Sequence, residues 1–296
     1  MIHNRNIVVN FHTITDIEWF ERTIIILKNK FKIIDIRDIE SFYHSGKIVR
    51  NACHITFDDG DLSFYEKVYP ILLKHRLPVT LFVSPQILVN GGNFWFQEIE
   101  DYDIKEMVKI LMSLTNKQED YFFNKDIYSI IKLFPIDFAY QAIEIYQKEN
   151  GVSPKPNQNM SLNQIEEIRK SGLVEIGAHT LTHPILKNET TERSNKEIRQ
   201  SILLLESLLH QKVICFAYPN GWPEIDYSVR EINILRDIGI KLAFSTENHS
   251  FSQKNDCLSI PRTGLSHGNS LYINTKLSLL PYVGHQWAYL RSKLYM

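Results

Sequence analysis

The chain has 296 residues, of which 44% are hydrophobic and 23% are charged, and its formal net charge is -1. This composition is that of a globular protein and argues against a disordered chain, and the near-zero charge provides no general attraction to nucleic acid. The three cysteines show no C-x-x-C spacing, which indicates reduced thiols and argues against a disulfide framework or a zinc cluster.

The N-terminus enters a strand-like stretch directly, without the charged and apolar regions of a signal peptide. No stretch approaches the roughly 18 consecutive apolar residues that span a bilayer. We therefore expect a cytoplasmic protein, with the inner face of the membrane as an alternative location. Residues 270–296 are expected to form a helical tail that either packs on the domain or makes a peripheral membrane contact.

Strand-like and helix-like stretches alternate along most of the chain. Asp16 is expected to cap the first helix, and Ser161 with Gln164 forms a capping-box pattern at the start of a later one. This alternation predicts a parallel α/β fold, either a barrel or a doubly wound sheet. The expected strands cover residues 7–11, 31–36, 52–57, 78–83, 173–178, 213–218, 240–245 and 257–260, and the expected helices cover 18–28, 39–45, 64–75, 161–172, 192–210 and 229–238.

The alternation is interrupted between residues 91 and 159, where the sequence is polar and aromatic and contains helical pieces such as 104–114 and 138–148. We interpret this stretch as a mostly helical insertion, a lid or a side wall, within a single domain of residues 1–296. Trp95, near its start, is a candidate platform for a sugar ring. The alternative is that Trp95 anchors a small core of the insertion.

Several polar residues directly follow expected strands. Because the active groups of parallel α/β barrels collect at the C-terminal ends of the strands, we expect these residues to lie close together. Adjacent residues of an extended segment point to opposite sides, so one of the two carboxylates can ligate a metal while the other faces a substrate. The residues at these positions are Asp58, Asp59, His179, Asn220 and Arg262.

A second histidine, His183, follows His179 at a spacing of four. Pro184 disfavours a helix at His183, so we expect a loop that brings both imidazoles to one ion. Catalytic zinc sites commonly use two histidines and a carboxylate and leave one position open. Asp59 is the candidate carboxylate ligand.

Residues 56–60 (Thr-Phe-Asp-Asp-Gly) and 179–183 (His-Thr-Leu-Thr-His) resemble the first two motifs of the NodB-homology polysaccharide deacetylases, carbohydrate esterase family 4, and residues 216–221 resemble the third. The resemblance implies a distorted (β/α)7 barrel with an inserted helical segment. It also implies a divalent metal, most often Zn2+ with Co2+ or Ni2+ as alternatives, held by Asp59, His179 and His183. By the same resemblance Asp58 is the general base for a water that attacks the acetamido carbonyl, and the metal and a backbone N–H near Asn220 stabilise the oxyanion.

The chain departs from the family pattern in two places. Ala217 stands where the third motif usually has an arginine that orients the base, and Arg262 is the candidate substitute, with a surface salt bridge as its alternative role. The late leucine-histidine motif, which supplies the general acid, has no match. Residues 10–12 (Asn-Phe-His) instead resemble the N-terminal element of the poly-N-acetylglucosamine deacetylase subgroup, which implies that His12 protonates the leaving amine. His267 is the competing candidate, and His12 would then be structural.

The sequence therefore predicts a metal-dependent hydrolase that removes an N-acetyl or similar N-acyl group from an amino sugar, in surface-polysaccharide or glycolipid biosynthesis. Its substrate would be a nucleotide-linked or lipid-linked sugar or an oligosaccharide, contacted by Tyr218, Asn220 and Trp95, and nucleic acid is not an expected partner. Two alternatives stay open at this point. One is a non-sugar amide hydrolase of the same superfamily, and the other is a catalytically silent sugar-binding protein.

Overall fold

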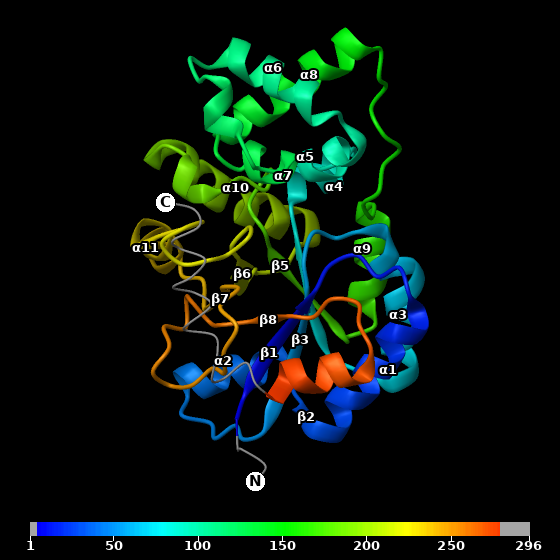
Figure 1. Ribbon diagram of the computed structural model, residues 1–296. Coiled ribbons are helices and arrows are strands. Elements are labelled where there is room, and N and C mark those ends of the chain that lie inside the picture. The colour runs from blue at the N-terminus through cyan, green and yellow to red at the C-terminus, as the bar shows by residue number, and fades with distance from the viewer. Residues whose placement is uncertain (1–4, 279–296) are drawn as a thin grey trace.

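The computed structural model describes residues 5–278 of the chain. Figure 1 shows a curled sheet at the centre, helices around it, and a helical insertion beyond one end of the strands. Within these residues eight strands pair in parallel: seven follow the order β7-β6-β5-β4-β3-β1-β8, and β2 pairs with the start of β3. The expected distorted α/β barrel is confirmed.

The described elements follow one another in the order that the sequence alternation predicts. The strands are β1 (Ile7–Phe11), β2 (Lys32–Ile33), β3 (Ala52–Phe57), β4 (Val79–Val83), β5 (Val174–Ala178), β6 (Cys215–Ala217), β7 (Leu242–Phe244) and β8 (Thr263–Gly264). The helices are α1 (Ile17–Lys30), α2 (Ile36–His44), η1 (Phe64–Val68), α3 (Tyr69–His75), α4 (Pro85–Asn90), α5 (Trp95–Glu98), η2 (Ile99–Asp101), α6 (Ile104–Leu114), η3 (Glu119–Phe122), α7 (Ile127–Ile131), α8 (Ile136–Asn150), α9 (Leu162–Lys170), η4 (Leu186–Asn188), α10 (Thr191–Leu209) and α11 (Val229–Asp237).

The central strands β1, β3 and β4 are buried along their whole length. Strands of a parallel sheet with both faces covered are apolar on both sides, which explains their nearly continuous Val, Ile and Phe content. Alternate residues separate into two clusters: Val9 and Phe57 belong to the larger cluster, while Val8 and Phe82 belong to a smaller one.

The curled sheet is closed by residues 257–264, which connect β7 to β1. The Ile260 N–H donates to the Ala243 carbonyl oxygen of β7 at 2.8 Å. Three residues later, Thr263 of β8 is the register partner of Val9 in β1. The closing segment therefore runs from the C-terminal end of β7 to the middle of β1 and carries Arg262 between them.

This segment differs from the strand expected at residues 257–260. Only Ile260 forms a bridge there, with Phe244, and the last strand is β8. Arg262 consequently precedes the last strand and does not follow it. The pairing depends on contacts with β1, far away in the sequence, which a local apolar pattern does not encode.

The strand expected at residues 31–36 is also shorter, because β2 ends at Ile33. Asp35 accepts a hydrogen bond from the Asp38 N–H and thereby caps α2, which begins at Ile36. A capping aspartate ends the extended conformation, since it provides a partner for an otherwise unpaired N–H of the first helical turn.

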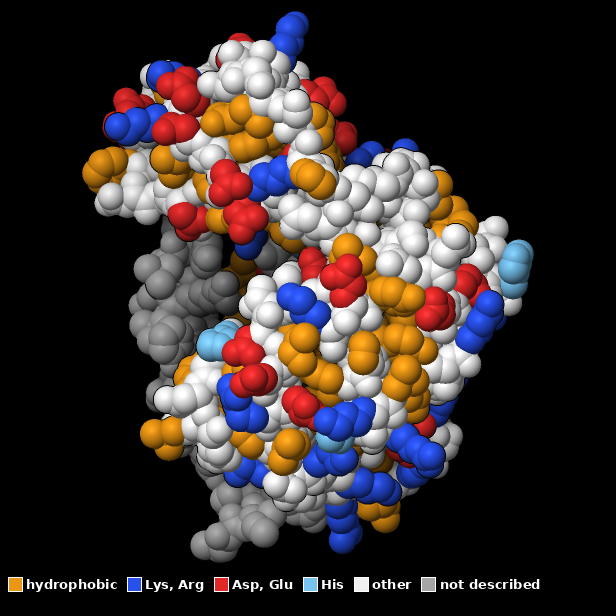
Figure 2. All heavy atoms as spheres, turned by 90° about the vertical axis from the view of Figure 1, so that its right-hand side faces the viewer, with side chains coloured by type: hydrophobic (Ala, Val, Ile, Leu, Met, Phe, Trp, Pro, Cys, Tyr) orange, Lys and Arg blue, Asp and Glu red, His pale blue; other side chains and the backbone are white. Residues whose placement is uncertain are grey.

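The insertion between β4 and β5 has its own hydrophobic cluster, built from residues of α5 to α8. Its two ends are joined by buried polar side chains. The Asn93 amide donates to Glu98 at 2.8 Å, the Gln97 amide to Asn159 at 3.0 Å, and the Asn159 amide to the Gly92 carbonyl at 3.0 Å. These bonds join the two ends of the insertion to each other. The Leu62 N–H of the barrel donates to the Gln158 carbonyl at 2.8 Å and fixes this base to the barrel, which favours a side wall over a hinged lid. Figure 2 shows a hollow between this wall and the barrel.

Residues 270–278 are helical and place Ile273 and Leu277 against the main core. The rest of the expected tail, residues 279–296, lies outside the described residues, and so does most of the surface for the expected membrane contact. Within residues 5–278, no helix is long and apolar enough to cross a bilayer.

Candidate active site

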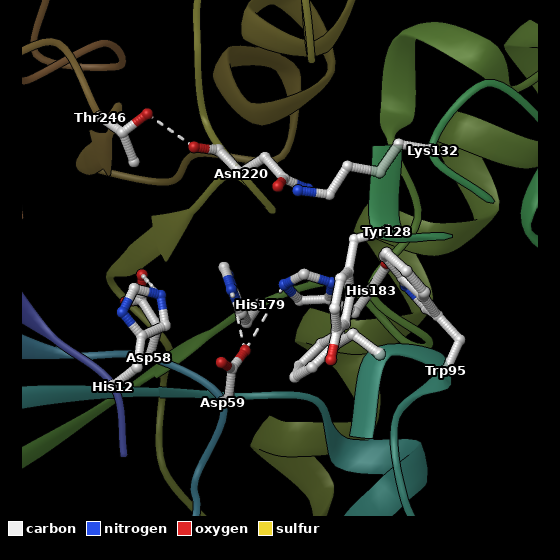
Figure 3. A pocket seen from close by; sticks show the side chains of 11 residues that line it. His12, Asp58, Asp59, Trp95, Tyr128, Lys132, His179, His183, Asn220 and Thr246 are labelled. Carbon is white, nitrogen blue, oxygen red and sulfur yellow. Dashed lines mark hydrogen bonds and ion pairs between the residues drawn. The ribbon is translucent and has the colours of Figure 1, made fainter. Parts of the chain in front are cut away.

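A cavity of about 340 Å³ lies at the C-terminal ends of the strands, between the barrel and the insertion (Figure 3). The barrel contributes residues that follow β1, β3, β5, β6 and β7, and the insertion contributes residues of α5 and α7. The predicted convergence of strand-end residues is therefore present. The lining residues are His12, Asp58, Asp59, Trp95, Phe96, Tyr128, Lys132, His179, His183, Asn220 and Thr246.

Asp59, His179 and His183 offer three ligand atoms that all lie within 4.8 Å of one another, and all three residues are buried. The Nε2 atoms of His179 and His183 lie 3.6 and 3.4 Å from Asp59 Oδ1. Asp59 reaches this position because its backbone adopts a left-handed φ of 73° after β3 ends. The chain is no longer extended there, so Asp58 and Asp59 line the same cavity and do not point to opposite sides.

The protonation of these groups suits a divalent metal. Nδ1 of His179 lies 2.7 Å from the Ala217 carbonyl oxygen, so this nitrogen carries the hydrogen and Nε2 keeps its lone pair. Burial lowers the pKa of His183 well below its usual value, which leaves a neutral imidazole, the form that binds metals. Asp59 Oδ1 is buried and has no hydrogen-bond partner among the described residues. A buried carboxylate oxygen without a hydrogen-bond partner, placed between two imidazole Nε2 atoms, fits a cation, and the residues therefore fit the implied metal.

The loop that joins the two histidines is strained and is held by a buried glutamate. Thr180 and His183 both have left-handed backbones, with φ of 65° and 61°. Glu197 of α10 is fully buried, and its Oε2 accepts hydrogen bonds from the N–H groups of Leu181 and Thr182, each at 3.0 Å. Its Oε1 accepts a third from Thr182 Oγ1 at 2.9 Å. These bonds offset the cost of the left-handed residues and fix the distance between the metal ligands.

We expect Glu197→Ala to lower the affinity for Zn2+ about 10- to 100-fold, as loss of a group that orients metal ligands typically does. Competition with a chromophoric chelator measures this affinity. Glu231→Ala is the matched control, because Glu231 is equally buried but binds Ser194 and Ser228, away from the loop. An equal loss of affinity in both variants would show a general effect on folding and would contradict a role for Glu197 in the loop.

Asp58 is paired with Arg262, as the sequence analysis anticipated. The guanidinium donates to both carboxylate oxygens, at 2.7 and 2.8 Å, and Arg262 is fully buried. A surface salt bridge is therefore excluded as its role. Burial by itself raises the pKa of Asp58, but the Arg262 guanidinium and the nearby His179 and His12 outweigh burial and hold this pKa well below its usual value. Asp58 is thus kept as a carboxylate next to the metal ligands.

The two candidate acids occupy different places. His12 lines the cavity, and its Nε2 lies 3.7 Å from Asp58 Oδ2, with the side chain 56% exposed. His267 contacts Asp16 at 3.1 Å and does not line the cavity. Only His12 can reach a substrate bound beside Asp58, and its exposure excludes a buried structural role.

Tyr218, predicted to contact the substrate, is a core residue, so this prediction is wrong. Its side chain is fully buried, its hydroxyl donates to the Leu258 carbonyl at 2.9 Å, and its ring stacks on Tyr227 with 3.6 Å between centroids. Its N–H donates to the Phe244 carbonyl. The residue points to the helix side of the sheet because side chains alternate along β6 and its continuation.

We expect Tyr218→Phe to lower the free energy of unfolding by about 1 to 3 kcal/mol, because the Leu258 carbonyl is left buried without its donor. The KM of a reaction in the cavity should not change. Urea denaturation and steady-state kinetics measure the two quantities. A raised KM at unchanged stability would restore Tyr218 as a substrate contact.

Trp95 lines the cavity, but only 2% of its surface is exposed, which leaves little area for stacking on a sugar. Its indole N–H donates to the His183 carbonyl at 3.2 Å. The neighbouring ring of Phe96 lies 5.1 Å from the His183 ring. Trp95 belongs to the hydrophobic cluster of the insertion, so the sugar platform is wrong and the alternative, an anchor of the insertion's small core, is confirmed.

Asn220 lines the cavity as predicted. Its side-chain Nδ2 is buried and has no hydrogen-bond partner among the described residues, so it can donate to a substrate. The expected backbone donor for the oxyanion is not available at Gly221, because the Gly221 N–H already donates to the Pro219 carbonyl.

Sequence reasoning missed three lining residues: Tyr128, Lys132 and Thr246. Tyr128 and Lys132 belong to the insertion and face the site only because that segment folds back over the strand ends. Thr246 follows β7. Its position directly after an expected strand was the one feature of the sequence that could have indicated it as a site residue.

A family model described as polysaccharide deacetylase matches residues 46–243, more than half of the chain. The chain is also similar to the poly-beta-1,6-N-acetyl-D-glucosamine N-deacetylase of Staphylococcus aureus (strain MSSA476), at 24% identity over 235 residues. The matched region covers 79% of this chain and 61% of that relative, so the chain spans less than two thirds of the relative's length.

Two solved structures resemble this structure over most of both chains. IcaB from Ammonifex degensii has a TM-score of 0.62 at 17% identity and covers 96% of this chain and 97% of its own. The Streptococcus pyogenes deacetylase PplD in complex with acetate has a TM-score of 0.59 at 17% identity, with coverages of 88% and 92%. These likenesses show the shared fold. The family model matches residues 46–243, and the chain therefore belongs to the polysaccharide deacetylase family.

Proposed function

We propose that this protein is a metal-dependent hydrolase that removes the N-acetyl group from an amino sugar of a surface polysaccharide. The observation that carries the proposal is a single cavity in which the Asp58 carboxylate, paired with a buried arginine, lies beside a buried set of two histidines and an aspartate. A base next to a metal-ligand set suits hydrolysis, and pure binding of a sugar requires neither.

The residues divide the work as follows. Asp59, His179 and His183 hold the divalent metal, which we propose to be Zn2+ and which, when bound, supplies Lewis acidity to the acyl carbonyl and to water. Asp58 takes a proton from the attacking water, and His12 gives a proton to the leaving amine on the exposed side of the cavity. The Asn220 amide donates to a substrate oxygen. The products are acetate and a free amino sugar.

Arg262 also bears on the alternative of a catalytically silent sugar-binding protein. The only sequence feature in favour of that alternative was Ala217, in the place of the arginine that orients the base. In the structure the guanidinium of Arg262 reaches Asp58 from the closing segment of the barrel. This contact gives Asp58 an arginine partner from another position in the chain. The absence of an arginine at position 217 therefore no longer supports a catalytically silent protein. The name of the Staphylococcus aureus relative supports an N-acetylglucosamine polymer as substrate.

The test measures metal content and acetate release together, in the wild-type protein and in Asp59→Ala and His183→Ala. We expect about one zinc per chain in the wild type, loss of the metal in both variants, and acetate release from β-1,6-linked N-acetylglucosamine oligomers only when metal is bound. His249→Ala is the control, because His249 lies outside both the ligand set and the cavity.

If the wild-type protein bound neither added zinc, cobalt nor nickel, the hydrolase proposal would fall and sugar binding would replace it. If it bound metal and hydrolysed small non-sugar amides but no N-acetylated sugar, the non-sugar branch of the superfamily would be the correct assignment.

A further inference from the structure

A second cavity, of about 220 Å³, adjoins the catalytic one. Lys132 and Asn220 line both cavities, so these two residues lie at the border between them. Asp58, His12 and the three metal ligands line only the first cavity. The second cavity is therefore a place for a part of the substrate that does not react.

The arrangement around the metal ligands indicates which part of the substrate this is. In Figure 3, His12 and Asp58 lie on one side of Asp59. Tyr128 and Lys132 lie on the other side. The leaving nitrogen faces His12, because His12 protonates it, and the sugar that this nitrogen carries lies on the same, exposed side. Since a tetrahedral carbon directs its bonds apart, the chain of the acyl group then points away from His12, toward Tyr128 and Lys132.

The surface on this side of the metal ligands suits a hydrocarbon chain. In the first cavity it includes the ring of Tyr128. In the second cavity it includes Leu133 of the insertion, Ile185, and Trp222 and Ile225 of the loop after β6. Apolar side chains of this kind stabilise methylene groups that leave water. The acyl chain therefore meets apolar contacts on its way from the first cavity into the second.

The two walls of the second cavity are held together by bonds between the insertion and the barrel. The Asn188 amide donates to the Lys132 carbonyl at 2.6 Å. At the start of α8, the Ile136 N–H donates to Oε1 of the buried Glu189 at 2.7 Å. Because these bonds fix both walls, the cavity is a preformed extension of the catalytic one and need not be opened by the ligand.

The polar groups of the second cavity favour a neutral and mainly apolar ligand. Among the described residues that line it, only Lys132 and Asp226 are charged, and their charges are opposite. The Asp226 carboxylate accepts a hydrogen bond from the Trp222 N–H at 2.8 Å, and the Asn188 amide is already bound to a carbonyl. A ligand with many hydroxyl groups would leave some of them buried without partners, whereas a hydrocarbon chain requires none.

We propose that the second cavity holds the chain of an N-acyl group longer than acetyl, and that the protein is an N-deacylase for short-chain acyl groups such as butyryl. This inference rests on the proposed hydrolase function, because the same Asp58 and His12 act in it. The oxygen of water bonds to the acyl carbon while a proton of that water passes to Asp58, and the C–N bond breaks as His12 gives a proton to the nitrogen. One water is consumed, and the products are a short-chain carboxylic acid and a free amino sugar.

The test compares kcat/KM for the N-acetyl, N-propionyl and N-butyryl forms of one β-1,6-linked glucosamine trimer, so that only the acyl chain changes. Fluorescent labelling of the released amine detects all three reactions alike. For the wild-type protein loaded with zinc, we expect the butyryl form to exceed the acetyl form by about tenfold or more, because each added methylene in an apolar pocket can contribute a factor of this order.

Two substitutions fill the second cavity from its opposite walls, Leu133→Trp and Ile225→Trp. In both variants the butyryl-to-acetyl ratio should fall about tenfold or more, because a filled cavity does not admit the chain without strain. Leu203→Trp is the matched control, since Leu203 is a 64% exposed leucine of α10 that lines neither cavity, and it should keep the wild-type ratio. Ile225→Trp keeps the test valid if Leu133→Trp does not fold.

A kcat/KM for the butyryl form that is equal to or below that of the acetyl form, or an unchanged ratio in both filled variants, would overturn the acyl site. Failure of the hydrolase proposal is distinguishable, because it gives no free amine from any of the three trimers. In that case calorimetric binding of the same trimers to Asp58→Asn decides the inference separately. Tighter binding of the butyryl trimer, lost in the Ile225→Trp background, supports the acyl site, and equal binding of the butyryl and acetyl trimers refutes it.

Discussion

Replacing Asp58 with asparagine should lower kcat about 10²- to 10⁴-fold and leave the bound metal in place. The amide has nearly the shape of the carboxylate but cannot take a proton from water. Asp58 is not one of the three residues whose ligand atoms converge, so the metal site itself should be intact. Metal analysis and acetate release on the same preparation measure both quantities.

Asp61→Asn is the matched control for this variant. Asp61 lies three residues further along, is buried to a similar degree and accepts a hydrogen bond from the Ser63 N–H at 2.9 Å, but it does not line the cavity. It should therefore retain most of the wild-type kcat. A fall in metal content in Asp58→Asn that accounts for the lost activity would contradict the separation between base and metal ligands.

The stability of Asp58→Asn must be measured alongside, because an asparagine leaves the buried Arg262 charge without its full partner. Assays well below the melting temperature separate this effect from the chemical one. Residual activity that follows the folded fraction, and not the proton acceptor, would point to unfolding.

Much of the site could be predicted because its residues stand at positions that the fold class itself brings together. β1 begins and ends at the expected residues, and the capping box at Ser161 is present. Once strands and helices alternate, right-handed parallel connections bring the strand ends to one side, so Asp58, Asp59 and His179 converge without further information. The positions of the metal ligands depend on the order of strands and helices and only little on contacts between distant segments.

What could not be predicted depends on contacts between distant segments. Lys132 faces the cavity only because the insertion is tied to the barrel beyond the strand ends, where the Asn188 amide donates to the Lys132 carbonyl. Tyr218 lies in a motif that suggested a substrate contact, but the direction of its side chain depends on the local course of β6. Arg262 was identified as the partner of Asp58, yet its place in the closing segment follows from the pairing of β8 with β1.

The pair of Asp58 and Arg262 has the largest expected effect on stability. Arg262→Met should lower the free energy of unfolding by about 3 to 5 kcal/mol, because it leaves a buried carboxylate without its counter-charge. The guanidinium also donates to the Ser245 carbonyl and to Thr56 Oγ1, so the substitution leaves further acceptors unpaired. Arg236→Met is the matched control. Arg236 is half-exposed and pairs with Asp256 at the surface, where such a pair contributes at most about 1 kcal/mol.

The pH dependence of the same variant has a definite sign. In the wild type the folded-state pKa of Asp58 is below its unfolded value of about 3.9, so the contribution of Asp58 to stability is complete above that pH and is lost only as the pH falls further. Without the guanidinium, burial dominates and raises the folded-state pKa above the unfolded value. The folded variant then binds more protons than the unfolded chain, and the stability that it has lost relative to wild type should shrink as the pH is lowered from 7 toward 4. The acidic limb of its kcat/KM profile should move to higher pH for the same reason.

Urea denaturation of wild type, Arg262→Met and the double variant Asp58→Asn/Arg262→Met across this pH range measures these effects. The double variant should be more stable than Arg262→Met at pH 7, since the unpaired buried charge is gone, and its stability relative to wild type should vary less with pH. It should also be inactive at every pH, because the base is missing. Two results would contradict this account. One is a stability difference between Arg262→Met and wild type that does not change with pH, and the other is a double variant no more stable than Arg262→Met. Either would show that the ion pair does not hold Asp58 ionised and that its low pKa has another source within the cavity.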